Sequence, residues 1–332
     1  MRAVVLGGIG HLGPSLVDLL RELGHEVVVA ARRESERKKP LIAAYLQKRG
    51  ARLALFPRLE EGVLAELGGD VYFYLVGKFT GSLQEFREGN VTLLEETARA
   101  AARSGARVVY LSSVAAVVGI KGLRPGSTVY EEEEHLSMER DPKSFYEVTK
   151  AEGERALVRM GKELKGRWSI LRPGIFLGPW GHHAIWRYSR RSLFLRLAPF
   201  FGVGLPVVDV RDVAEVLVEA GEGKYDGKWL HVVSPYYPDV GDLIMEGCRY
   251  LKRSCVALPL SPIGKAVIAL SPLAASLAPK GSALSLALSW LRFRYKFASR
   301  VLKREWRDVK DMVWGLLEWQ DWAARAGAAA GI

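Results

Sequence analysis

The sequence has a single asparagine, few cysteines and no apolar run long enough to cross a membrane. Cys248 and Cys255 are the only cysteines in 332 residues. They match no metal-ligand pattern, so we expect buried apolar thiols rather than a disulfide or a metal site. The longest apolar run, Ala266 to Pro279, is short and interrupted by proline. Together with its surroundings, Val256 to Leu291, it could instead contact a membrane surface or wall a pocket for an apolar substrate.

Asparagine occurs only at Asn90 and glutamine only three times, while lysine, arginine and glutamate are abundant. This composition suggests a thermophilic source, and the one retained asparagine suggests a specific role for its amide. With 49% apolar and 26% charged residues and no repeat, the chain has the composition of a globular protein.

The formal net charge of +11 favours anionic partners such as nucleotides, phosphorylated substrates or a lipid surface. Because no zinc-finger or aromatic RNA-binding pattern accompanies the basic residues, we expect no nucleic-acid partner. An apolar strand begins directly after Met1 and leaves no room for a secretory signal. We therefore expect a cytoplasmic protein.

Short apolar runs alternate with amphipathic segments through the first half of the chain. The runs cover residues 2–6, 26–31, 51–56, 70–76, 107–113 and 168–173. Strands of this kind, separated by helices, are typical of the α/β class with a doubly wound parallel sheet, the Rossmann fold.

The alternation loosens after Pro173 and returns at residues 205–234. We predict a dinucleotide-binding domain of residues 1–173, completed by 205–234. Residues 174–204 and 235–332 would form a smaller, discontinuous C-terminal substrate region over the carboxyl edge of the sheet, where ligands bind in such folds.

A glycine-rich turn links the first strand to the first helix. In "VVLGGIGHLGPSL", Gly7, Gly10 and Gly13 form GxxGxxG around Ile9. Glycine there permits a tight turn, close approach of a pyrophosphate and close packing of helix on strand, and the helix N-terminus favours an anion. The pattern predicts a dinucleotide site.

The second strand ends in Arg32 and Arg33, where an acidic residue usually meets the ribose of NAD(H). Guanidinium groups suit a 2′-phosphate instead, so NADP(H) is favoured and NAD(H) is the alternative. The same arginines could also belong to a solvated basic loop.

Several motifs occur in a familiar order over nearly the whole chain: "GGIGHLG", "GNVTLLEETARAA", "RVVYLSSVAAVVG", "YEVTK", "LRPGIFLGP" and "VVDVRDVAEVL". With them the chain resembles the extended short-chain dehydrogenase/reductase (SDR) family, also called the NAD-dependent epimerase/dehydratase family. The resemblance implies that Tyr146 is the general acid/base, that Lys150 lowers its pKa and binds the nicotinamide ribose, and that Ser113 holds the substrate oxygen.

The spacing of Tyr146 and Lys150 is consistent with these roles. Residues four apart share a helix face, and an ammonium beside a phenol favours the phenolate. The resemblance also places Gly77 and Pro173 beside the cofactor and Asn90 at the active-site end of the sheet, although each could be a local structural residue. It further implies a homodimer formed through the helix that carries Tyr146.

The resemblance leaves three functions open. Val114, Ala115 and Ala116 stand where sugar dehydratases of the family have an Asp-Glu pair, which argues against dehydration. The leading interpretation is an NADP(H)-dependent oxidoreductase acting on a secondary alcohol or ketone. One alternative is a nucleotide-sugar 4-epimerase with tightly bound NAD. The candidates to hold its substrate phosphates are arginines of the second region, which could equally form a solvated helix face: Arg187, Arg190, Arg191 and Arg196. The other is a non-catalytic cofactor-binding scaffold.

Overall fold

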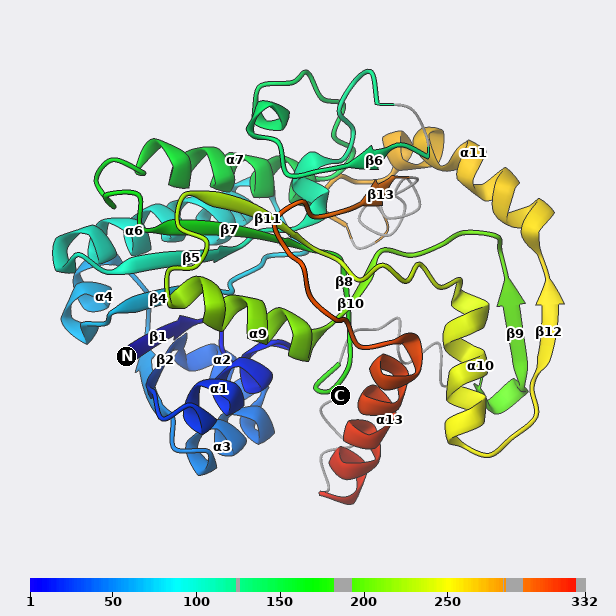
Figure 1. The fold of residues 1–332 in the computed structure, drawn as a ribbon, viewed down its shortest axis with the longest axis horizontal. Helices are drawn as coiled ribbons and strands as arrows, with labels where there is room; N and C mark the ends of the chain where they lie inside the picture. The colour runs from blue at the N-terminus through cyan, green and yellow to red at the C-terminus, as the bar shows by residue number, and fades with distance from the viewer. Residues whose placement is uncertain (124–125, 182–192, 283, 285–294, 327–332) are drawn as a thin grey trace.

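A seven-stranded parallel sheet forms the centre of the protein (Figure 1). The computed structural model describes residues 1–123, 126–181, 193–282, 284 and 295–326. The strand order is β11-β7-β5-β4-β1-β2-β3, and every pairing is parallel. The strands are β1 Arg2–Leu6, β2 Glu26–Arg32, β3 Arg52–Phe56, β4 Val71–Tyr74, β5 Arg107–Leu111, β7 Trp168–Pro173 and β11 Lys228–Val232.

The strands are continuously apolar because helices cover both faces of the sheet. Alternate strand residues pack in opposite directions: Val5 and Phe73 join one core, Val4 and Tyr72 the other. The first core is covered by α1 Gly13–Glu22, α3 Pro40–Lys48 and α9 Val210–Gly221. The second is covered by α4 Glu61–Leu67, α6 Leu93–Ser104 and α7 Phe145–Arg159. The predicted doubly wound α/β fold is confirmed.

Shorter helices connect these elements near the carboxyl edge of the sheet. They are α2 Arg33–Lys38, α5 Leu83–Arg87, the π-helix η1 Glu88–Thr92, and the 3-10 helices η2 Val114–Val117 and η3 Glu133–Leu136. The Ser82 hydroxyl caps α5, with Glu85 closing a capping box. The Ser144 hydroxyl accepts a hydrogen bond from Glu147 N and so fixes the start of α7.

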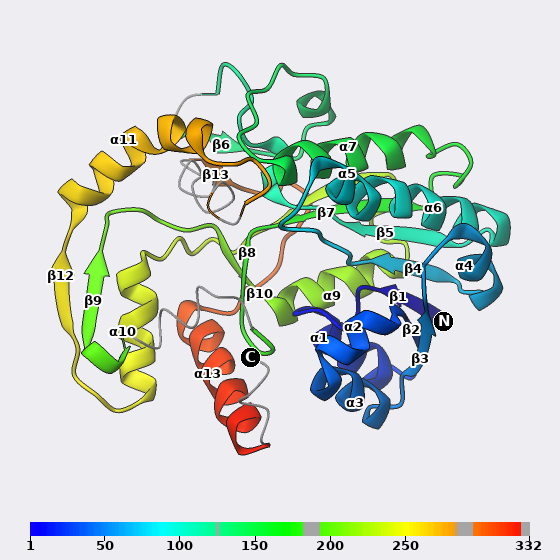
Figure 2. The ribbon, with the colours of Figure 1, turned by 180° about the vertical axis from the view of Figure 1, so that it is seen from behind.

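Both ribbon views show that the remaining elements lie mostly to one side of the sheet (Figures 1 and 2). Three two-stranded parallel pairs occur there: β6 Thr128–Val129 with β13 Lys296–Phe297, β8 Ile175–Leu177 with β10 Val207–Asp209, and β9 Leu197–Phe200 with β12 Val256–Pro259. The helices are α10 Val240–Tyr250, α11 Ser261–Leu277 and α13 Val309–Arg325. Segments 1–173 and 205–234 supply the seven-stranded sheet, and the domain boundaries themselves stay a prediction.

The structure corrects the prediction for the two cysteines. Cys248 near the end of α10 and Cys255 just before β12 form a disulfide, with their Cα atoms 6.2 Å apart. The short turn between α10 and β12 brings the two positions within bridging distance, which the residue spacing alone does not reveal.

Candidate active site

The turn between β1 and α1 depends on glycine at Gly7 and Gly13. Gly7 has a φ of 78°, and a Cβ there would lie 3.0 Å from the carbonyl carbon of Leu75. At Gly13, the first residue of α1, a Cβ would lie 1.8 Å from the carbonyl oxygen of Gly8. Gly10 N donates to Gly7 O at 3.0 Å, which closes the turn. The loop and helix therefore pack as closely as the sequence pattern predicts.

This turn leaves the N-terminus of α1 without a side-chain cap. Leu12 occupies the cap position and makes no capping hydrogen bond, so the first N–H groups of the helix remain available to an anion. Ile9 is buried, so only its backbone can face a ligand.

Two exposed arginines stand at the end of β2. Arg32 is its last residue and Arg33 begins α2. Neither forms an ion pair with a residue that the structure describes. Neighbouring Glu34 is paired with Lys38 at 2.6 Å, and this contact, with the charge of Arg32, holds the pKa of its carboxyl below the usual range. The local potential at this corner of the sheet is therefore positive.

The three predicted catalytic side chains meet where β5 ends and α7 begins. Tyr146 is buried, and the Ser113 side chain lies near enough to influence the pKa of its phenol. The Lys150 Nζ lies 5.9 Å from the centre of the Tyr146 ring and donates to the carbonyl oxygen of Leu111 at 2.9 Å. Ser113 Oγ also accepts from Ala115 N at 3.2 Å, which fixes the hydroxyl at the start of η2.

The electrostatics of this group differ from the sequence prediction. Burial raises the pKa of Tyr146 to about 12, although the nearby Ser113 hydroxyl acts in the opposite direction. Burial also lowers the pKa of Lys150 to about 7, against an opposing contribution from Glu154. Without cofactor, Lys150 therefore carries only part of a positive charge at neutral pH, and Tyr146 is a phenol rather than a phenolate.

A buried ionic group that the sequence analysis missed lies one helical turn beyond Lys150. Glu154 accepts from Ser112 Oγ at 2.5 Å and from Arg172, whose Nη2 lies 2.7 Å from Oε2. Glu154 and Arg172 are both fully buried. The signal was present in the sequence, because Glu154 follows Lys150 by four residues on the helix face that turns inward.

Asn90 joins the loop after β4 to α7. Its Oδ1 accepts from Lys78 N at 3.1 Å, and its Nδ2 donates to Thr149 Oγ1 at 2.9 Å. The side chain is completely buried. An amide suits this position because it both donates and accepts, which explains why a sequence poor in asparagine keeps one here.

The other predicted residues lie at carboxyl ends of strands. Gly77 is exposed after β4, and a Cβ there would lie 3.3 Å from the ring of Phe79. Pro173 is buried at the end of β7, in register with Val232 of β11. Their contacts with a cofactor stay predictions.

Two segments remote in sequence border Tyr146. The half-exposed ring of Phe79 stacks on it, with ring centres 5.2 Å apart. Phe145 N donates to Lys280 O at 3.1 Å, and Gly81 N donates to Gly281 O at 3.0 Å. The chain just after α11 is thus fastened beside the site.

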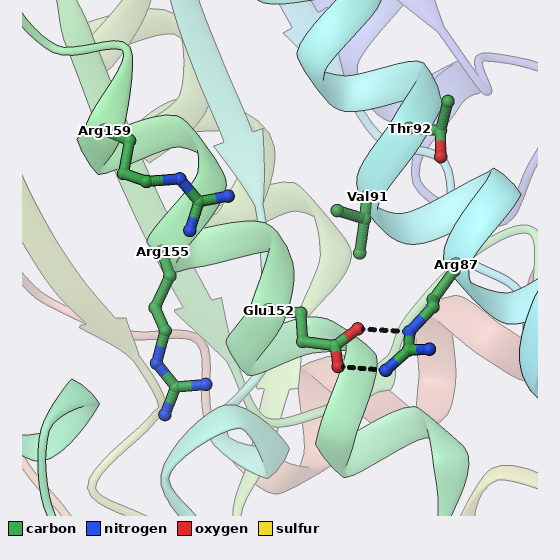
Figure 3. A pocket seen from close by; sticks show the side chains of 6 residues that line it. All are labelled: Arg87, Val91, Thr92, Glu152, Arg155 and Arg159. Carbon is green, nitrogen blue, oxygen red and sulfur yellow. Dashed lines mark hydrogen bonds and ion pairs between the residues drawn. The ribbon is translucent and has the colours of Figure 1, made fainter.

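A separate surface pocket lies between α5, η1 and α7 (Figure 3). Glu152 forms a two-point ion pair with Arg87 there, at 2.7 and 2.9 Å. The lining of this pocket includes none of the predicted catalytic or cofactor residues. We therefore place the reactive site at Tyr146, where the chemistry is, and not in this pocket.

Of the arginines considered for a substrate phosphate, Arg187, Arg190 and Arg191 lie outside the described residues. Arg196 is exposed just before β9, with a φ of 56°, and its carbonyl oxygen accepts from Val256 N. Among the described residues, no hydrogen bond or ion pair joins Arg196 to a predicted catalytic side chain.

Comparison with known families decides the identity of this arrangement. The sequence model of the "NAD dependent epimerase/dehydratase family" matches residues 3–228, which contain the glycine turn, Ser113, Tyr146 and Lys150. The chain belongs to the NAD-dependent epimerase/dehydratase family. It is an enzyme of that family, and membership implies a nicotinamide dinucleotide cofactor. No curated protein matches the chain at a significant level.

Solved structures with the same fold include several epimerases. UDP-glucuronic acid 4-epimerase from Bacillus cereus, in complex with NAD, is 16% identical over 99% of both chains, with a TM-score of 0.69. UDP-glucose 4-epimerase from Thermotoga maritima, with UDP-glucose, is 16% identical over 98% of this chain and 100% of that one, with a TM-score of 0.66. UDP-glucose 4-epimerase from Stenotrophomonas maltophila, with NAD and formylated UDP-arabinopyranose, is 19% identical over 98% and 99%, with a TM-score of 0.65. At these identities the likeness shows the fold.

The residues of this family member fit a dinucleotide. The uncapped start of α1 offers backbone donors to the pyrophosphate, and the glycine turn leaves no side chain in their way. Arg32 and Arg33 stand at the end of β2, and Lys150 is held between the ends of β4 and β5, and the contacts of these residues with a cofactor stay predictions.

Proposed function

We propose that this enzyme is an NADP(H)-dependent oxidoreductase that interconverts a secondary alcohol and a ketone. The observation that carries the proposal is the convergence of Ser113, Tyr146 and Lys150 at the carboxyl edge of the sheet, the edge at which the glycine turn also lies. Arg32 and Arg33, which have no carboxylate partner among the described residues, support a 2′-phosphate on the cofactor.

The chain's own residues supply orientation and a proton. The Ser113 hydroxyl would hold the substrate oxygen, and the Tyr146 phenol would donate its proton to that oxygen as the ketone is reduced. When bound, the cofactor supplies the hydride. In the oxidative direction the Tyr146 oxygen would accept the alcohol proton. A phenol with a raised pKa is suited to the reductive direction, because it is protonated at neutral pH.

Lys150 would hold the nicotinamide ribose. Its Nζ donates to the carbonyl oxygens of Leu111 and, at 3.5 Å, Val76, which fixes the amine between β4 and β5. Glu154 favours the protonated amine from the next helical turn. The same arrangement keeps the third donor of the ammonium free to reach a ribose hydroxyl.

One observation favours the second candidate, a nucleotide-sugar 4-epimerase. The solved structures named above are UDP-sugar 4-epimerases, and two of them contain NAD. The oxidoreductase is favoured by the arginines at the end of β2, which suit a 2′-phosphate. The buried Val114 and Ala115 leave no carboxylate next to Ser113 for a dehydration. A non-catalytic scaffold is the weakest of the three, because the catalytic side chains are intact.

Replacing Tyr146 tests the mechanism. We expect Tyr146→Phe to lower kcat by about 10²–10⁴-fold, since only the proton-transferring hydroxyl is removed. Turnover is followed as oxidation of NADPH with a panel of ketones and, separately, as interconversion of UDP-glucose and UDP-galactose. Net NADPH oxidation supports the oxidoreductase, whereas sugar interconversion without net cofactor change supports the epimerase.

Tyr72→Phe is the matched control. The Tyr72 hydroxyl is also buried against the sheet but donates to Leu64 O, far from the site, so activity should stay at the wild-type level. A Tyr146→Phe enzyme within a few-fold of wild type would refute the proposed chemistry.

Replacing Arg32 tests the cofactor. We expect Arg32→Ala to weaken NADP(H) binding by about 10- to 100-fold, the loss of one charge-assisted hydrogen bond, and to leave NAD(H) binding nearly unchanged. Calorimetric titration of both cofactors measures this. Arg37→Ala, an exposed change later in α2, should alter neither affinity. Equal effects of Arg32→Ala on the two cofactors would contradict the NADP(H) preference.

A further inference from the structure

The net charge of the protein comes from one segment. Residues 247–304 contain eleven lysines and arginines and no aspartate or glutamate, and the rest of the chain holds 37 basic and 37 acidic residues. The whole formal charge of +11 therefore belongs to a segment that includes β12, α11 and β13. Three of these basic residues pair with glutamates outside the segment: Arg249 with Glu246, Arg300 with Glu132 and Arg304 with Glu215. The exposed Lys252, Arg253 and Lys265 around β12 and α11 form no such ion pair among the described residues, and they favour an anionic partner.

Within this segment, α11 carries its large apolar side chains on the outside. Ile263, Leu270, Leu273 and Leu277, here called the α11 ridge, are 56–79% exposed. Their spacing of 7, 3 and 4 residues places them along one stripe of the helix. The neighbouring side of the helix is small and packed inward at Gly264, Ser271 and Ala278, each of which directly follows a ridge residue. A Cβ on Gly264 would lie 2.1 Å from the carbonyl oxygen of Phe201, so that face is in close contact with the protein.

The ridge lies on the outer rim of the molecule. In both ribbon views α11 and β12 form the margin farthest from the N-terminal strands, and no described element covers their outer side (Figures 1 and 2). Exposed basic residues border it: Lys265 within α11, Lys280 just after it, and Lys252 and Arg253 before β12. Val256 at the start of β12 extends the apolar surface and is 60% exposed.

We propose that the α11 ridge docks on an anionic lipid surface, with α11 lying in the interface. The leucines would enter the boundary between headgroups and acyl chains while the lysines and arginines remain at the headgroups. Among the described residues no helix is both long and apolar enough to cross a membrane.

The charge near the α11 ridge favours an anionic lipid surface over a second copy of the chain as its partner. Two copies meeting ridge to ridge would bring the exposed lysines and arginines beside the two ridges together, and like charges across a contact oppose association. An anionic bilayer offers both an apolar interior for the leucines and negative headgroups for the basic rim. This inference does not rest on the proposed function, since docking requires no turnover.

The test is flotation of the purified protein with lipid vesicles. We expect binding to vesicles of phosphatidylglycerol mixed with phosphatidylcholine, weaker binding to phosphatidylcholine alone, and loss of binding at high salt. Leu273→Glu should lower the apparent affinity by about 10-fold or more, because a full leucine side chain contributes roughly 1.5–3 kcal/mol on burial. Leu273→Met should bind like wild type.

Leu23→Glu is the matched control, since Leu23 is also a half-exposed leucine but lies at the end of α1, away from α11. It should bind vesicles normally. Failure of the wild type to float, or equal binding by Leu273→Glu, would overturn the proposal. So would sedimentation velocity showing that Leu273→Glu converts a dimer to a monomer, because the ridge would then bind a second copy.

Discussion

At the scale of single residues, Lys150 shows how burial sets the chemistry of the site. Its amine is almost fully buried and hydrogen-bonded to the carbonyl oxygen of Leu111. Water no longer solvates the ammonium, so its pKa falls to about 7 despite the neighbouring carboxylate of Glu154. A lysine in this state changes charge near neutral pH, unlike a surface lysine.

The titration of Lys150 is directly measurable. In the cofactor-free enzyme labelled with ¹³C-lysine, we expect the Lys150 signal to shift as the pH passes about 7, gaining its proton as the pH falls. Absence of the signal in Lys150→Met assigns it. Lys121, whose pKa is raised by its ion pair with Glu139, should not move over this range. A Lys150 signal that titrates only above pH 10 would show that the amine is solvated.

At the scale of elements, α7 separates two kinds of ion pair on its two sides. Inward, Glu154 meets Arg172 where neither side chain is exposed to solvent. Outward, Glu152 meets Arg87, which is 51% exposed. The two glutamates lie two residues apart on the same helix, so they form a matched comparison.

Neutralising these two glutamates should have unequal effects on stability. Glu154→Gln leaves the Arg172 charge buried without a partner, which costs about 3–5 kcal/mol of unfolding free energy. Glu152→Gln should cost about 1 kcal/mol or less, because water screens the outer pair. Denaturant unfolding monitored by tryptophan fluorescence gives both values. Equal losses would mean that the inner pair is no more important than the outer one.

The elements that could be predicted from sequence are those with local signals. Buried strands such as β1 and β5 are continuous apolar runs, and α1 follows a glycine turn. The π-helix η1 and the outward leucines of α11 were not predictable, because each depends on what packs against the element. Asn90, for example, lies within η1 and reaches Thr149, 59 residues away.

At the scale of the whole molecule, the sequence indicated the candidate catalytic side chains but not the contacts that hold them in place. Ser113, Tyr146 and Lys150 were identifiable because they stand in motifs. Their supporting contacts join distant parts of the chain: Ser112 with Glu154, and Gly81 with Gly281. Such contacts arise from the topology of the sheet and leave no local pattern. The predictions of a homodimer, a thermophilic source and a cytoplasmic location stay predictions.

Ion pairs connect the segment before α13 to α9 of the Rossmann fold. Arg307 bonds to Asp212 and Glu215 of α9, and Arg304 also pairs with Glu215. Asp212 is almost fully buried, and this burial raises the pKa of its carboxyl. The last part of the chain is thus fixed to the helix that covers the first core, although about 90 residues separate the partners.

The order of strands also determines how the nascent chain matures. β7 ends at Pro173, but its neighbour β11 begins only at Lys228. At a ribosomal rate of roughly 5–20 residues per second, the edge of β7 remains without its partner for about 3–10 seconds during synthesis. An unpaired apolar strand is a template for association with other chains. Until β11 has been synthesised, this edge of β7 is therefore exposed to association with other chains.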